Sequence, residues 1–142
     1  MNGRPSRILP VIIFSQFTGA SLWFASNAVM ADLQRAWGLA DAALGYMTSA
    51  VQFGFIVGTL VFAFFTFSDR FSPRIIFFAC SLLGAISNLC IYLLAQGLPS
   101  LMTFRFVTGF LLAGIYPVGM KIATGWGLKD RGLLVGILVG AM

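Results

Sequence analysis

The chain has 142 residues, of which 59% are hydrophobic and 9% are charged, and its mean hydropathy is +0.95. Soluble domains are about 45–50% apolar and about 25% charged, so this composition excludes a soluble globular enzyme and a disordered chain. The net charge is +5, and the sequence contains neither histidine nor glutamate. Without histidine, a histidine-based metal site and a Ser-His-Asp triad are excluded. Basic residues lie in short gaps between long apolar runs rather than on one polar face, so nucleic acid is not an expected partner.

Five apolar runs follow one another, which predicts an all-α integral membrane protein. A spanning helix needs about 20 apolar residues, and four runs are long enough: residues 8–29, 44–67, 75–95 and 101–122. The fifth run, 132–142, would cover only about 16 Å of a hydrocarbon core about 30 Å thick. We therefore expect four complete spans and a truncated fifth, with residues 1–142 forming part of a longer chain and no soluble domain. A re-entrant last helix is the alternative.

The distribution of basic residues predicts how these helices cross the membrane. Cytoplasmic loops carry an excess of lysine and arginine. One side of the predicted bundle carries seven basic residues and the other side carries only Arg35. The seven are Arg4, Arg7, Arg70, Arg74, Lys121, Lys129 and Arg131. The N-terminus is therefore expected in the cytoplasm.

Polar side chains inside the spans are the candidates for a solute cavity, because burying them in a bilayer is costly. At 100° per residue, one face of the first span carries Gln16, Ala20, Trp23 and Asn27, and one face of the fourth span carries Arg105, Thr108, Leu112 and Tyr116. The candidate cavity residues are Gln16, Trp23, Asn27, Gln52, Asn88, Arg105 and Tyr116. The alternative is that these side chains only form hydrogen bonds between helices and hold the bundle together.

Arg105 is the one charged residue placed well inside the four complete predicted spans, and no acidic residue in these spans can balance it. A guanidinium in low dielectric favours an anionic partner and suits bidentate binding of carboxylates or similar oxyanions. A small organic or inorganic anion is therefore the expected substrate. Two other roles remain open: Arg105 pairs with a carboxylate from helices beyond this sequence, or it snorkels to the outer interface.

Glycines at small-xxx-small spacing and one proline are the candidates for helix packing and kinking. Such spacing lets helices approach closely, or slide against one another. Pro117 removes a backbone donor within the fourth span and is expected to kink it. The glycines assigned to packing are Gly54, Gly58, Gly109, Gly132, Gly136 and Gly140.

Residues 68–74, between the second and third spans, resemble the signature loop of major facilitator superfamily transporters. The family pattern is Gly-x-Leu-small-Asp-Arg/Lys-x-Gly-Arg-Arg/Lys, and it is matched by Ser68, Asp69, Arg70 and Arg74. The sequence departs from it at Phe65, Phe67, Ser72 and Pro73. The fourth span resembles the family's Arg-x-x-polar-Gly stretch through Arg105, Thr108 and Gly109.

This resemblance covers essentially the whole chain and implies part of the N-terminal, six-helix half of such a transporter. The implied function is secondary transport of a small solute by alternating access, with a coupling proton or counter-ion, no cofactor and no metal. The implied partners are the lipid bilayer and the C-terminal half of the same chain, in an inner (plasma) membrane of bacterial type. Asp69, Arg70 and Arg74 would form a cytoplasmic gating loop. Arginines there can pair with carboxylates of a facing element and stabilise one of two states.

Two other classes of function compete with this interpretation. A self-contained small membrane protein, such as an oligomeric channel or small exporter, remains the main alternative. An enzyme is not expected, because no paired acid, Ser/Lys or His/Asp constellation lies within the spans.

Overall fold

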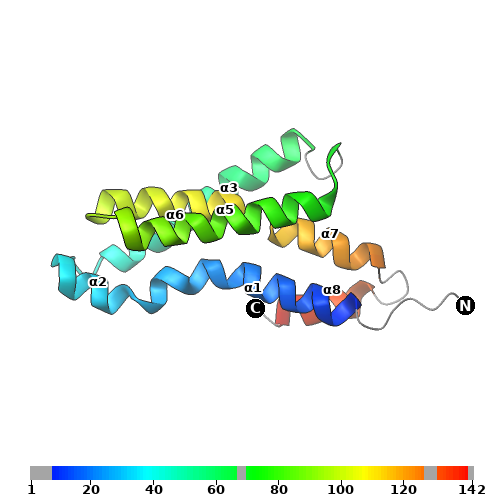
Figure 1. The fold of residues 1–142 in the computed structure, drawn as a ribbon, viewed down its shortest axis with the longest axis horizontal. Coiled ribbons are helices and arrows are strands. Elements are labelled where there is room, and N and C mark those ends of the chain that lie inside the picture. The colour runs from blue at the N-terminus through cyan, green and yellow to red at the C-terminus, as the bar shows by residue number, and fades with distance from the viewer. Residues whose placement is uncertain (1–7, 67–69, 127–130, 141–142) are drawn as a thin grey trace, which may run out of the picture.

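The computed structural model describes residues 8–66, 70–126 and 131–140, and these are helical with short connections and no strand (Figure 1). The prediction of an all-α fold is confirmed for these residues. The elements in chain order are α1 (Ile8–Ala28), α2 (Met30–Trp37), α3 (Ala43–Phe64), α5 (Pro73–Leu94), α6 (Leu98–Leu112), α7 (Tyr116–Trp126) and α8 (Arg131–Gly140).

Three helical stretches in the described part of the chain are long and apolar enough to cross a membrane. They are Ala43–Phe64, Pro73–Leu94 and Leu98–Gly125, the last of which runs through α6 and α7. In α1 the corresponding apolar stretch, Pro10–Ala25, is shorter. The second, third and fourth predicted spans therefore have counterparts, and the fourth is divided into two helices.

The short helix α2 lies between the first and second predicted spans, where no helix is expected from the length of the apolar runs. Leu33 and Trp37 are four residues apart, so they share one face, and they pack against the buried cluster formed by Ala43, Met47, Ile91 and Leu101. Gly38 ends the helix with a left-handed φ of 61°, and its N–H donates to the carbonyl of Gln34. The α2 segment therefore covers one end of the bundle.

Helices α3 and α6 pack backbone against backbone. A Cβ atom built on Gly54 or Gly58 would overlap the backbone of Phe106 or Phe110 on α6. In return, a Cβ atom on Gly109 would overlap the backbone of Val51 on α3. Glycines on both helices thus permit a separation that any larger residue would prevent.

Elsewhere the packing is made by side chains, and the outward faces remain apolar. A second buried cluster, contributed by α3, α5, α6 and α7, consists of Val51, Ile76, Cys80, Leu112, Ile115 and Val118. Large apolar side chains such as Phe53, Leu60 and Phe78 are more than half exposed. Such a surface is unusual for a soluble protein and suits contact with lipid.

Helix α8 lies beside α1 and α7 (Figure 1). Its glycines Gly132, Gly136 and Gly140 do not pack like those of α3 and α6. A Cβ atom on any of them would meet nothing within 4 Å. Among the residues with described positions, these three glycines therefore bring no second helix close.

Candidate functional site

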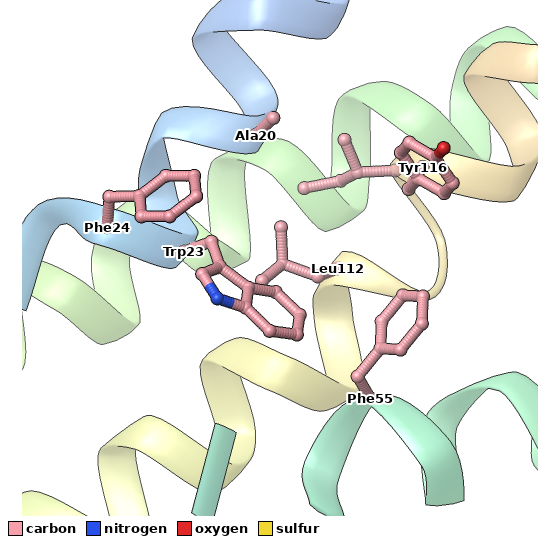
Figure 2. A pocket seen from close by; sticks show the side chains of 7 residues that line it. Ala20, Trp23, Phe24, Phe55, Leu112 and Tyr116 are labelled. Atoms are coloured by element: carbon pink, nitrogen blue, oxygen red, sulfur yellow. The ribbon is translucent and has the colours of Figure 1, made fainter. Parts of the chain in front are cut away.

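A cavity of about 270 Å³ lies where α1, α3 and the junction of α6 with α7 meet (Figure 2). This volume is close to the lower end of ordinary ligand pockets, about 300 Å³. Trp23 and Phe55 meet edge to face across it, with ring centroids 5.7 Å apart and an interplanar angle of 76°. None of the lining side chains is charged. They are Ala20, Trp23, Phe24, Phe55, Leu112, Ile115 and Tyr116.

The junction of α6 and α7 supplies one wall of this cavity and interrupts the predicted fourth span. The N–H groups of residues 113–115 bond to carbonyls three residues back, at 3.3, 2.9 and 3.0 Å, so the chain turns tightly there. Pro117 follows directly and has no N–H to offer the carbonyl of Ala113, four residues back. The interruption therefore lies beside the proline at which the sequence predicts a kink.

Arg105 of α6 is completely buried and is bonded to α1. Its Nη2 donates to the carbonyl oxygen of Trp23 at 2.7 Å and to Oδ1 of Asn27 at 3.5 Å. Its Nη1 donates to the carbonyl oxygen of Leu22 at 3.4 Å. A backbone carbonyl has two lone pairs, so it can accept from Arg105 in addition to its own helical donor. The guanidinium therefore attaches α6 to the backbone of α1.

This arrangement contradicts the snorkelling role expected for Arg105, whereas the anion-binding role and the pairing with a carboxylate from helices beyond this sequence stay predictions. No carboxylate in the described part of the chain lies within ion-pair distance, and the ion pair present there joins exposed Asp32 and Arg35 at 3.8 Å. The side chain has 0% exposure, so it does not extend to either interface. It also does not line the aromatic cavity. Backbone acceptors are the partners that the sequence could not indicate.

Gln16 makes a second polar contact, between α1 and α7. Its side chain is 1% exposed, and its Nε2 donates to the carbonyl oxygen of Tyr116 at 3.4 Å. Its Oε1 occupies the place where a Cβ atom of Gly119 would lie, and this oxygen has no hydrogen-bond partner among the described groups. Gly119 thus leaves the space in which the amide of Gln16 lies.

The structure brings together five of the seven predicted cavity residues. Gln16, Trp23 and Asn27 share the face of α1 that contacts α6 and α7, as their spacing predicts. They meet Arg105 and Tyr116 there. Of these five residues, only Trp23 and Tyr116 line the cavity.

The remaining two of the seven, Gln52 and Asn88, lie away from this interface. Gln52 is exposed on α3, where neither the cavity nor Arg105 reaches it. Asn88 is half-buried on α5, and its Nδ2 donates to the carbonyl oxygen of Gly84 at 3.2 Å.

The predicted gating loop falls partly outside the described residues. Asp69 belongs to the part that is not described. Arg70 and Arg74 are both exposed near the start of α5. They therefore lie on the surface at the end of the bundle opposite α2 (Figure 1).

Several residues of the site escaped the sequence analysis. Phe55, Phe24 and Leu112 are apolar residues in apolar helices, so nothing in their chemistry distinguished them from lipid-facing neighbours. Gly119 has no glycine four residues away on either side, so it was not among the glycines assigned to packing. A signal was available for Leu112 and Ile115, because Pro117 close after them predicts a kink in the span.

Comparison with known proteins gives one match. The family model described as Major Facilitator Superfamily matches residues 12–142. Comparison with curated proteins and with solved structures finds no match. The matched region includes every residue of the cavity and both polar contacts of α1.

Proposed function

Because this chain belongs to the Major Facilitator Superfamily, a family of membrane transporters, we propose that it carries a small solute across the bilayer by alternating access. The observation that supports this most directly is the solute-sized cavity at the junction of α6 and α7. Transporter sites of this kind lie near the bilayer midplane, where interrupted helices meet. In this proposal, residues 1–142 contribute four spans and part of a fifth to the N-terminal half.

The contacts between helices suggest which parts move together. Helices α3 and α6 are interlocked through their glycines, and α1 is attached to α6 by Arg105 and to α7 by Gln16. These four helices would move as one unit around the cavity. Alternating access then requires this unit to rock against the other half of the transporter, so that the cavity opens to each side in turn.

The gate of such a motion is proposed at the exposed arginines near the start of α5. With the N-terminus in the cytoplasm of a bacterial-type inner membrane, Arg70 and Arg74 would face the cytoplasm together with Asp69. Pairing with carboxylates of the other half would favour the state that is closed on that side. Coupling to a proton or counter-ion is part of the same proposal.

A small anion remains a candidate solute only if Arg105 leaves its present partners. The guanidinium would have to give up the carbonyls of Leu22 and Trp23 and turn toward the cavity. An anion could replace them, since a bidentate pair with a carboxylate is stronger than bonds to neutral acceptors. The present geometry favours the role of Arg105 as a link between helices.

Uptake into proteoliposomes tests the proposed function. The protein is expressed from its complete reading frame, reconstituted, and screened against labelled carboxylates, sugars, amino acids and aromatic compounds, with and without a pH gradient. Saturable uptake and exchange of internal for external solute are expected for at least one compound. Non-saturable flux with unitary conductance steps would instead identify a channel, the main alternative.

A further inference from the structure

The walls of the aromatic cavity are apolar, and the cavity is open on one side. Its lining comes from α1, α3 and the junction of α6 with α7, and no polar atom of the lining faces the interior. A charged group that lay against these walls would lose water on that side and find no donor or acceptor there to replace it. The part of a solute that occupies this cavity is therefore uncharged.

The charge of Arg105 does not alter this conclusion. The guanidinium is 0% exposed and points to the carbonyls of Leu22 and Trp23, on the backbone side of α1. Its Nε–H has no partner among the described groups, but Arg105 does not line the cavity, so in this arrangement the guanidinium does not reach an anion there. A cation is disfavoured too, because no acidic side chain lines the cavity and the arginine contributes a positive charge nearby.

The shape of the lining favours a flat ring over an aliphatic chain. Figure 2 shows the rings of Trp23, Phe24, Phe55 and Tyr116 around Leu112, and Trp23 and Phe55 already adopt the edge-to-face geometry of aromatic pairs. Another ring packed beside this pair, within the cavity, would extend the arrangement. An apolar cavity of about 150 Å³ stays dry and accepts benzene, so about 270 Å³ suits one or two rings.

We propose that the solute of this transporter presents an uncharged aromatic group of one or two rings to Trp23, Phe55 and Tyr116. This inference rests on the proposed function and names the chemical class of the solute. The charge and polarity of the rest of the solute depend on the helices that complete the site.

Equilibrium binding to proteoliposomes tests the inference, with protein-free liposomes of the same lipid as the measure of partition into the bilayer. Four probes separate charge from aromaticity: 2-naphthol, 2-naphthoate, 2-naphthylmethylammonium and the saturated decahydro-2-naphthol. Two variants alter the cavity: Phe55→Ala removes a ring, and Ala20→Leu fills the space from α1. Phe53→Ala and Ala25→Leu are matched controls, because both residues are exposed on the same helices outside the cavity.

Saturable binding of 2-naphthol is expected, weakened about tenfold by Phe55→Ala and by Ala20→Leu and unchanged in the controls. Tighter binding of the naphthoate or of the ammonium probe would overturn the uncharged class. Equal binding of decahydro-2-naphthol would overturn the aromatic preference. The absence of saturable binding for all four probes would also refute the inference. Such a failure would leave uptake and exchange of another solute intact, so it is distinguishable from failure of the proposed function.

Discussion

At the scale of single residues, a buried guanidinium must find acceptors, because an unpaired charge in a low-dielectric interior costs several kcal/mol. Arg105 finds them in the backbone of α1, at the carbonyls of Leu22 and Trp23 and at Asn27. The same bonds place Trp23 against the cavity. This arginine therefore acts on the site by positioning α1.

Replacing Arg105 tests this positioning role. We expect Arg105→Gln to lower stability by about 2 kcal/mol, because the bonds from a charged donor to α1 are lost. Arg105→Lys should recover only part of this loss, since an ammonium lacks the fork that reaches two carbonyls. Thermal unfolding can be followed in detergent with a dye that reacts with the buried Cys80 thiol, after Cys90→Ala. The control Arg35→Gln removes an exposed charge; an equal effect of Arg35→Gln and Arg105→Gln would refute the link.

The contact between Gln16 and Gly119 lends itself to a double-mutant cycle. Gly119→Ala alone should destabilise the protein, because the new Cβ atom overlaps Oε1 of Gln16. In the Gln16→Ala background the same change should cost little, which gives a coupling of about 1–2 kcal/mol. The same dye assay measures all four proteins. Additive effects of the two changes would mean that the side chain of Gln16 does not depend on the space at Gly119.

At the scale of elements, the interlocked glycines of α3 and α6 form the tightest helix pair described. We expect Gly109→Ala to lower stability by about 1–3 kcal/mol, because the added methyl forces the backbones apart. Gly45→Ala is the matched control on α3, where a Cβ atom meets open space. That change should be neutral or stabilising by up to about 1 kcal/mol. The unfolding temperature distinguishes the two variants, and equal effects would argue against close packing at Gly109.

How well each element could be predicted depends on the kind of signal it leaves in the sequence. Helices α3 and α5 follow from long apolar runs, because the thickness of a bilayer fixes their length. The helix α2 was missed because eight amphipathic residues between two spans resemble a loop, although Gly38 marks where it ends. Pro117 indicated where the fourth span is interrupted, because the absence of an N–H follows from the residue type alone.

The candidate site was only partly predictable for a related reason. The stripe of Gln16, Trp23 and Asn27 follows from helical periodicity, and the structure brings these residues to one interface. The backbone partners of Arg105 cannot be identified from residue types, because every residue has a carbonyl. Phe55 was equally hidden among the many phenylalanines of α3.

At the scale of the whole molecule, the proposed transport requires the cavity to open to the two sides of the membrane in turn. The helices α1, α3, α6 and α7 line the cavity, and they are joined by the close glycine contacts and by the hydrogen bonds of Gln16 and Arg105. If Asp69 contributes to the cytoplasmic gate, weakening the gate must shift the balance between the two states without altering the cavity. Asp69→Asn should therefore move exposure from one side to the other.

The most direct test measures the reactivity of a single cysteine, Ala20→Cys, in a protein expressed from its complete reading frame with Cys80→Ala and Cys90→Ala. Membrane-impermeant thiol reagents are applied from each side of oriented vesicles, and Ala25→Cys, exposed on α1 outside the cavity, serves as the control position. The account predicts that Asp69→Asn raises the reactivity of Ala20→Cys from the cytoplasmic side and lowers it from the other. A rise on both sides together, or labelling from one side under every condition, would contradict alternating access.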